Sequence, residues 1–259
     1  MSSVNDHALV EGFDLTVSGG VGTLVLSRPA KRNALSREMW LALPDIMAAI
    51  DADPGIEVLI LTGAGGHFSA GSDIGDLDVP LADFWAANAE AEEALAAVDV
   101  PTIAAIEGNC VGGGTELAAA CDVRIAAPGT IYGVTAAKLG LVYPPGPTRR
   151  LAGIIGDAWA TYFLLTAEII DFDQALNLGF IHRVSDTPLD TAREMAATIA
   201  GRSALSQTGA KRILRGEDPD PAAGGWLAEA YASEIVRGQE GFFAKQPPEF
   251  TFARHDWRS

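Results

Sequence analysis

The chain has little of what metal, disulfide and membrane proteins are built from. It contains only two cysteines and four histidines in 259 residues. Cys110 and Cys121 lack a CxxC spacing and stand among small apolar residues, so buried free thiols are expected rather than a disulfide scaffold. The histidines have no spaced partners, and no metal site is expected. No apolar run approaches the roughly 20 residues that cross a bilayer, so no membrane partner is expected.

Basic residues are also scarce. Eighteen lysines and arginines face 34 aspartates and glutamates, a net charge of −16, which disfavours nucleic acid and anionic lipid as partners. The first 14 residues have neither a basic flank nor an apolar run, so no secretory signal is predicted and a cytoplasmic location is expected. Three basic doublets occur, and each is interpreted first as a solvated surface pair: Lys31-Arg32, Arg149-Arg150 and Lys211-Arg212.

What the chain does have is an alternation of strand-like and helix-like segments, which predicts an α/β class. At 48% hydrophobic residues it is long enough to bury a substantial core. Short apolar or alternating runs predict strands at 15–17, 21–26, 57–62, 101–106 and 123–126. Helices are predicted at 36–50, with Ser36 as the N-cap, and at 81–98, 115–120 and 226–236.

Two glycine-containing loops each follow a predicted buried strand and precede a helix. They span residues 67–74 and 108–116, and the second contains three consecutive glycines at 112–114. Glycine lets another group approach the backbone, and the first N–H groups of the following helix have no intrahelical acceptor. Such N–H groups suit an anion or a developing oxyanion. The spacing matches neither a P-loop, nor a Gly-x-Gly-x-x-Gly fingerprint, nor a Gly-x-Ser-x-Gly elbow.

Taken together, the two loops resemble the crotonase (enoyl-CoA hydratase/isomerase) superfamily. The resemblance rests on Phe-Ser-Ala-Gly-Ser-Asp-Ile at 68–74, Pro-Thr-Ile-Ala-Ala-Ile-Glu-Gly at 101–108, and Gly-Gly-Gly-Thr-Glu-Leu-Ala at 112–118, followed by Cys121-Asp122. Further matches are Arg28-Pro29-x-x-x-Asn33-Ala34-Leu35 and Ala175-x-x-x-Gly179, with a looser one at Phe242-x-x-Lys245-x-Pro247. The resemblance covers residues 13 to 250.

The resemblance implies a crotonase-like spiral of ββα units with a C-terminal helical oligomerisation region. Residues 1–200 would form the core with the acyl-CoA site. Residues 201–259 would pack between the subunits of a homotrimer or of a hexamer built as a dimer of trimers. The implied function is that of a lyase or isomerase of fatty acid metabolism. No separate cofactor is implied, since coenzyme A is part of the thioester substrate.

The matching positions also imply a site. The oxyanion hole falls on the backbone N–H groups of Ser72 and Gly113, which would stabilise a thioester enolate, and Glu116 matches a catalytic acid/base. Lys31, Arg32 and a neighbouring subunit's Lys245 would meet the phosphates of coenzyme A. The full set of implied coenzyme A-binding positions is Lys31, Arg32, Ala34, Ser69, Ala70, Ser72, Asp73, Ile74 and Lys245.

The sequence departs from the superfamily at the second catalytic glutamate of its hydratases, whose position falls on Ala136. Alanine cannot transfer a proton. Tyr143 resembles the methylmalonyl-CoA decarboxylase branch, which keeps the first glutamate and lacks the second, although that branch has histidine where this chain has Ser72. His67 is expected to point to solvent and is given no role.

Three hypotheses therefore stay open. The first is a hydratase or isomerase in the broad sense that uses Glu116 alone. The second is an acyl-CoA decarboxylase in which Tyr143 orients the substrate carboxylate, because loss of CO2 produces the same enolate without a strong base. The third is a non-catalytic acyl-CoA-binding homologue that kept the fold after losing the second glutamate.

Overall fold

The computed structural model describes residues 9–76, 80–220 and 225–257. Its first strands, β1 (Phe13–Ser18) and β2 (Val21–Leu26), form an antiparallel hairpin. Gly19 and Gly20 turn the chain with φ values of 57° and 80°, which glycine adopts at little cost. The predicted hairpin is confirmed.

The main sheet continues from this hairpin through β3 (Val58–Gly63), β4 (Thr102–Ile106), β6 (Val123–Ala126) and β9 (Arg183–Val184), in the order β1-β2-β3-β4-β6-β9. From β2 onward, neighbouring strands are parallel. A smaller sheet contains β5 (Asn109–Val111), β7 (Ile131–Gly133) and β8 (Ile169–Asp171). Strand β5 lies inside the second glycine loop, where the sequence predicted no strand.

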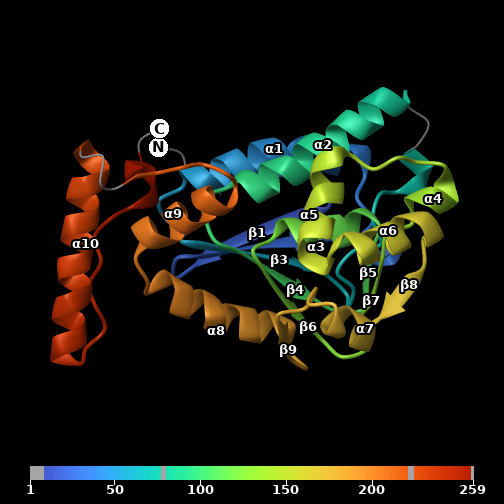
Figure 1. Ribbon diagram of the computed structural model, residues 1–259. Coiled ribbons are helices and arrows are strands. Elements are labelled where there is room, and N and C mark those ends of the chain that lie inside the picture. Colours follow the sequence, from blue (N-terminus) through green and yellow to red (C-terminus); the bar gives the residue numbers. More distant parts are fainter. Residues whose placement is uncertain (1–8, 77–79, 221–224, 258–259) are drawn as a thin grey trace.

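Helices cover both faces of the main sheet (Figure 1). α1 (Arg37–Ala52) and α2 (Leu81–Ala97) lie along one face, and α8 (Pro188–Ala200) lies along the other. The Ser36 hydroxyl accepts a hydrogen bond from the Met39 N–H, so the predicted cap of α1 is confirmed. Trp40 of α1 belongs to the larger core, whereas Ala192 and Ala196 of α8 pack against β3 and β4 in a smaller one.

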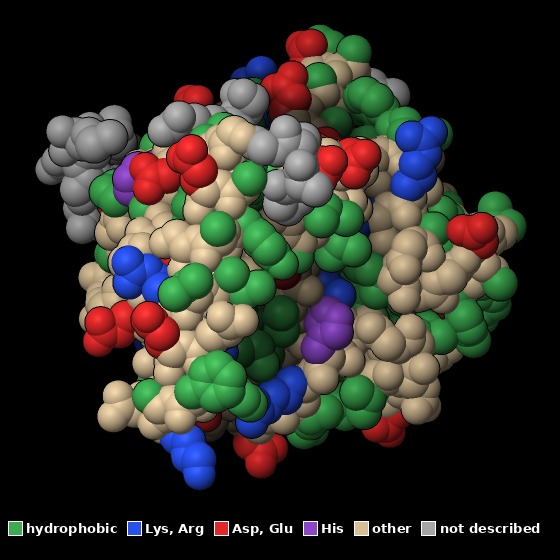
Figure 2. All heavy atoms as spheres, turned by 60° about the vertical axis from the view of Figure 1, so that its left-hand side comes forward, with side chains coloured by type: hydrophobic (Ala, Val, Ile, Leu, Met, Phe, Trp, Pro, Cys, Tyr) green, Lys and Arg blue, Asp and Glu red, His purple; other side chains and the backbone are tan. Residues whose placement is uncertain are grey.

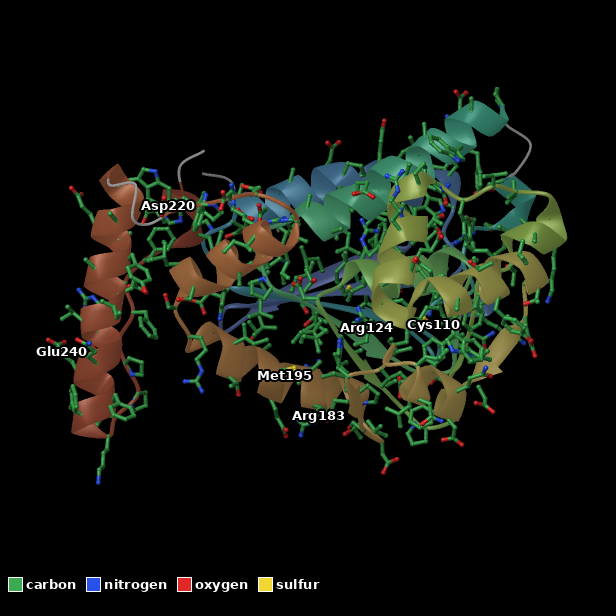
Figure 3. All side chains as sticks on the ribbon, viewed as in Figure 1. Cys110, Arg124, Arg183, Met195, Asp220 and Glu240 are labelled. Carbon is green, nitrogen blue, oxygen red and sulfur yellow. The ribbon has the colours of Figure 1, made fainter. Side chains whose placement is uncertain are left out.

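Shorter helices complete the body: α3 (Gly113–Ala120), α4 (Ala136–Leu139), α5 (Pro145–Ile155), α6 (Asp157–Thr166) and α7 (Phe172–Asn177). Every residue of α3 is buried, because its glycines and alanines allow neighbouring elements to approach closely. Cys110 and Cys121 are free and buried, as predicted. Figure 3 shows Cys110 and Arg124 inside the body, where the Arg124 guanidinium donates to backbone carbonyls.

The first C-terminal helix, α9 (Ala204–Leu214), is fixed to the body by ion pairs. Lys211 Nζ lies 2.6 Å from the Asp122 carboxylate, and Arg212 Nη2 lies 2.6 Å from that of Asp99. The interpretation of Lys211-Arg212 as a solvated surface pair is therefore wrong. Their side chains are only 12% and 20% exposed, because they cover the partly buried carboxylates.

The last helix, α10 (Gly225–Ala244), stands apart from the α/β body and is longer than predicted (Figure 1). Figure 2 brings this side of the molecule forward and shows hydrophobic side chains around a hollow in the surface. Figure 3 shows Glu240 on the side of α10 that faces away from the body. The exposed hydrophobic side chains of α10 are Tyr231, Ile235, Val236, Phe242 and Phe243. The division of the chain at residue 200 stays a prediction.

The α/β class predicted from the sequence is confirmed by these layers. Within the described ranges, no helix combines the length and the apolar character that crossing a membrane requires.

Candidate active site

The two glycine loops meet because they follow β3 and β4, neighbouring parallel strands whose carboxyl ends lie at the same edge of the sheet. The Ser69 N–H donates to the Asn109 carbonyl at 2.8 Å, and the Val111 N–H donates to the Ser69 carbonyl at 3.0 Å. A Cβ on Gly71 would lie 2.8 Å from Val111 O, and one on Gly114 would lie 2.6 Å from Ser69 O. Glycine is needed at both positions for the loops to touch.

The two N–H groups predicted to form the oxyanion hole, those of Ser72 and Gly113, lie close to each other. A Cβ on Gly113 would lie 3.7 Å from Ser72 N, and one on Gly71 would lie 3.0 Å from Gly113 N. Gly113 begins α3, where an N–H has no intrahelical acceptor. Within the described part of the chain, neither N–H donates to a loop or turn carbonyl. Two unpaired donors therefore stand side by side, as stabilisation of an oxyanion requires.

A mostly apolar cavity opens at these two amides, between the first glycine loop, α2, the start of α3 and the segment 135–144. A larger cavity beside the C-terminal tail is lined by no residue of either glycine loop. The cavity at the amides is lined by Ala70, Gly71, Ser72, Ile74, Phe84, Trp85, Asn88, Gly112, Gly113, Glu116, Thr135, Ala136, Leu139, Leu141, Val142, Tyr143 and Pro144. It thus brings together all four predicted catalytic residues with Ala70 and Ile74.

Glu116 stands in the first turn of α3 and is only 3% exposed. Burial is the main cause that raises its pKa well above the ordinary value. Repulsion by the Glu92 carboxylate and the hydrogen bond between the two carboxyls raise this pKa further, whereas the Arg150 guanidinium opposes the shift. A carboxyl whose pKa is raised towards neutrality can both take up and return a proton at physiological pH.

Glu92, on α2, is the residue that the sequence analysis missed. Its side chain is fully buried and does not line the cavity. Burial raises its pKa to about 7, against the hydrogen bond with Glu116 and the charge of Arg150. The sequence did hold a signal, since Asn88, Glu92 and Leu95 are spaced to share one helix face and all three are buried. A glutamate on such a face requires a partner.

Ala136 and Tyr143 both belong to the cavity wall. Ala136 begins α4 and is buried, so a methyl group stands where superfamily hydratases place their second glutamate. The Tyr143 hydroxyl lies 3.7 Å from the position that a Cβ on Gly112 would occupy. Burial, followed by the charges of Glu116 and Glu92, raises the pKa of Tyr143. Tyr143 is therefore neutral and can donate a hydrogen bond into the cavity.

Asp73 of the first glycine loop pairs with two cations of the segment 28–32, one of which is the predicted coenzyme A-binding residue Lys31. Lys31 Nζ and Arg28 Nη2 lie 2.6 Å and 3.0 Å from Asp73 Oδ2. The hydrogen bond from Lys31 is the main cause that lowers the pKa of Asp73. The Lys31 side chain is still 56% exposed, and Arg32, whose carbonyl accepts from the Ala70 N–H at 2.9 Å, is exposed as well. Both cations can therefore meet an anionic group beside the cavity.

The remaining coenzyme A-binding predictions lie elsewhere. Ser69 and Ala34 are buried behind the cavity wall. The Ser69 hydroxyl donates to the Asn33 carbonyl at 2.8 Å, and the Ala34 carbonyl accepts from Arg28 Nη1 at 2.6 Å, so both fix the loops. Lys245 follows α10, at the opposite end of the molecule from α4 (Figure 1). It could meet the cavity only from a neighbouring subunit, as the sequence analysis supposed.

His67 also joins the two loops, and the expectation that it points to solvent is wrong. Its Nδ1 accepts the Asn109 N–H at 3.1 Å, and its side chain is half-buried. His67 therefore supports the second glycine loop from behind rather than contacting the cavity.

Comparison with known proteins gives consistent matches. Residues 16–224 match the family described as enoyl-CoA hydratase/isomerase. The probable enoyl-CoA hydratase of Mycobacterium bovis is 36% identical over 242 residues, which cover 89% of this chain and 94% of that protein. The peroxisomal Delta(3,5)-Delta(2,4)-dienoyl-CoA isomerase of Arabidopsis thaliana is 32% identical over 82% of this chain and 83% of that one.

A solved structure agrees with these relatives. A protein of the enoyl-CoA hydratase/isomerase family from Hyphomonas neptunium matches with a TM-score of 0.85 and 36% identity, over 93% of this chain and 98% of the other. The predicted crotonase-like fold and the predicted broad function, an enzyme that acts on acyl-CoA thioesters, are thereby confirmed. The chain belongs to the enoyl-CoA hydratase/isomerase family of the crotonase superfamily.

Proposed function

We propose that this enzyme moves a double bond along an acyl-CoA thioester, converting a 3-enoyl-CoA into the conjugated 2-enoyl-CoA, with Glu116 as the only proton-transferring group. One observation carries the proposal. Glu116 is the single carboxyl among the described residues that line the cavity, and Ala136 replaces the second. A shift of one proton from C2 to C4 needs only one such group, whereas addition of water normally takes two.

In the proposed reaction, the thioester oxygen accepts hydrogen bonds from the Ser72 and Gly113 N–H groups. The Glu116 carboxylate takes a proton from C2, and the electron pair of that C–H bond forms a dienolate whose charge lies largely on the thioester oxygen. Each N–H donor would contribute about 3 to 4 kcal/mol to this intermediate. Glu116 then returns its proton to C4, and the double bond comes to lie between C2 and C3.

The raised pKa of Glu116 suits both half-reactions. A base is most effective when its pKa lies near the working pH, because it is then ionised often enough to act and basic enough to remove the proton. The apolar wall of the cavity keeps water from the dienolate and strengthens the hydrogen bonds to it.

Tyr143 favours a second candidate, decarboxylation of a malonyl-type acyl-CoA. A neutral hydroxyl in the cavity wall could orient the substrate carboxylate. Loss of CO2 would leave the electron pair of the broken C–C bond at C2 as a thioester enolate, and protonated Glu116 could deliver a proton to C2. This reaction would use the same two N–H donors.

The coenzyme A part of the substrate is proposed to meet Lys31 and Arg32 at the surface. The chain is proposed to work without a separate cofactor, as a homotrimer or a dimer of trimers. The exposed hydrophobic side chains of α10, such as Phe242 and Phe243, support burial of this helix against other subunits. The free, buried thiols of Cys110 and Cys121 support a cytoplasmic location.

The test is incubation of the purified protein with a 3-enoyl-CoA deuterated at C2, followed by mass spectrometry and NMR. Formation of the 2-enoyl-CoA with part of the deuterium at C4 is expected, because one carboxyl carries the proton between the two carbons. Malonyl- and methylmalonyl-CoA are tested in parallel. Release of CO2 without isomerisation would replace the first candidate by the second. Binding without a product from any thioester would exclude both and favour a non-catalytic homologue.

A further inference from the structure

Glu92 is fully buried, and full burial strongly destabilises an isolated ionised carboxylate. It is 0% exposed on the face of α2 that packs into the body. Within the described residues, neither of its carboxylate oxygens accepts a hydrogen bond from an N–H group or a hydroxyl. An ionised carboxylate buried without donors would cost several kcal/mol, so this group must gain a proton, a partner or both.

The partner is the carboxyl of Glu116, which is also buried and stands on α3, a helix that packs against α2. Each of the two carboxyls shifts the pKa of the other through a side-chain hydrogen bond. Two carboxylates cannot donate to each other, so a hydrogen bond between these groups requires a proton on one of them. Two buried carboxyls that interact with each other are not both ionised near neutral pH, because their negative charges repel each other. A proton shared with Glu116 therefore explains how the Glu92 carboxyl can be buried without an N–H or hydroxyl donor.

The neighbouring charges favour one proton rather than two. Arg150 of α5 is the cation that acts on both carboxyls. Its Nη2 lies 2.9 Å from Glu93, an exposed neighbour of Glu92 on α2, while its Nη1 is buried without a partner. Tyr143 also acts on the pair, and it is neutral because burial raises its pKa. Because the Glu93 side chain is 53% exposed and its charge is screened by water, Arg150 can still offset one negative charge on the buried pair, but not two.

We propose, on the basis of the function proposed above, that Glu92 and Glu116 form a carboxyl dyad that shares a single proton at neutral pH, with Glu92 as the positioning residue of Glu116. Glu92 lies outside the cavity wall, so it does not touch the substrate. It acts through Glu116 in two ways. The shared hydrogen bond fixes the orientation of the Glu116 carboxyl, and the proton that Glu92 donates stabilises the ionised form of this buried carboxyl, so that it can act as a base near neutral pH.

The proton count closes through the proposed reaction. Either carboxyl of the dyad can hold the shared proton, and the reactive form is the one in which Glu92 holds it and donates to the ionised Glu116. When Glu116 removes the proton from C2, the dyad holds two protons and is neutral, and the negative charge has moved to the thioester oxygen. When Glu116 returns its proton to C4, the starting state is restored without exchange with solvent.

The experiment compares Glu92→Gln with the wild-type enzyme in two readouts. Glutamine keeps the size of the side chain and a hydrogen bond to Glu116 but removes the shared charge. In Glu92→Gln the acidic limb of the kcat profile, where the ionised Glu116 takes up a proton, is expected to shift to higher pH by about one unit or more, because an amide is a weaker donor to the Glu116 carboxylate than a carboxylic acid and cannot share the negative charge. KM should stay within about twofold, because Glu92 does not contact the substrate. Glu90→Gln, an exposed glutamate of the same helix, is the matched control and should leave the profile unchanged.

The second readout needs no substrate. Infrared titration of the wild-type protein should show a protonated buried carboxyl at pH 7, whose ionisation midpoint falls in Glu92→Gln. If the wild-type protein shows no such carboxyl, the dyad is refuted even if the variant fails to fold. An unchanged acidic limb in a folded Glu92→Gln enzyme refutes it too. If the carboxyl titrates as expected while no thioester is isomerised, the dyad stands and the proposed function fails.

Discussion

Substitution of Gly113 by alanine should separate the contribution of the oxyanion hole from that of the fold. A Cβ on Gly113 would lie 2.7 Å from Cζ2 and 3.0 Å from Cη2 of Trp40. Real Cβ atoms do not approach other atoms so closely, so either the indole or the start of α3 must move. Trp40 is 1% exposed and packed in the larger core, which leaves the indole little room. The Gly113 N–H is therefore expected to leave its place beside Ser72 N.

The size of the effect follows from these contacts. Inserting one methyl group into a close-packed core usually costs about 1 to 3 kcal/mol of unfolding free energy. Loss of one preorganised oxyanion donor typically lowers kcat by about 100- to 1,000-fold. Gly113→Ala should therefore lose both stability and turnover. Gly153→Ala is the control, because Gly153 lies in α5, its Cβ would meet no atom within 4 Å, and alanine favours a helix by up to about 1 kcal/mol.

The assay is urea unfolding together with kcat for the best acyl-CoA substrate, in Gly113→Ala with and without Trp40→Phe. Phenylalanine lacks the benzo ring atoms that the new methyl group meets, and Trp40 Nε1 has no hydrogen-bond partner to lose. The second substitution should thus restore part of the stability lost in the first, with a coupling energy of about 0.5 to 3 kcal/mol. Wild-type kcat in a stably folded Gly113→Ala enzyme would refute the assignment of this amide to the oxyanion hole.

Three further predictions concern the charged groups of the site. Glu116→Gln should lower kcat by about 100- to 10,000-fold with little change in KM, and turnover close to wild type would contradict its role as the acid/base. Lys31→Ala should raise KM for an acyl-CoA but not for the matching acyl-pantetheine, which lacks the nucleotide phosphates; an equal rise for both would show that Lys31 acts through Asp73 alone. The free energy of unfolding should fall as the pH rises from 4.5 towards 7, because the pKa of Glu92 is about 7 in the folded chain and the folded chain therefore binds more protons in this window than the unfolded one. For Glu92 this is on the order of 3 kcal/mol, fully present below pH 4.5, and Glu92→Gln should flatten the dependence measured by urea unfolding at a series of pH values.

The elements whose local sequence and tertiary environment agree were predictable. The hairpin around Gly19 and Gly20, the cap at Ser36 and the buried strands of the main sheet were read from turn residues and apolar runs. Strand β5 was missed because its three residues lie between glycines, and its pairing with β7 is a contact with a distant segment. The extent of α10 was underestimated because Gly238 and Gly241 follow the predicted end at residue 236, and glycine normally disfavours the continuation of a helix.

The functional residues also differ in how far the sequence alone predicts them. The meeting of the two glycine loops at Ser72 and Gly113 was predictable, because the glycine spacing and the superfamily resemblance both depend on short stretches of sequence. The assignment of these amides to an oxyanion hole stays a prediction. The ion pairs of Lys211 and Arg212 were not predicted, since their carboxylate partners at Asp122 and Asp99 are about ninety or more residues away in sequence. Sequence spacing carries information about neighbours on one helix or strand, but not about which surface charges will meet after folding.

The loss of the second glutamate at Ala136 and the burial of Glu92 can be understood together. In a hydratase of this superfamily, two carboxyls face the substrate, and both can exchange protons with it. In this chain the second carboxyl approaches Glu116 from α2, behind the cavity wall, and alanine occupies the substrate side. A carboxyl in that position can change the basicity and orientation of Glu116, but it has no path to a water molecule or to a second carbon of the substrate. The arrangement therefore favours chemistry in which one group removes and returns one proton, and it disfavours addition of water across the double bond.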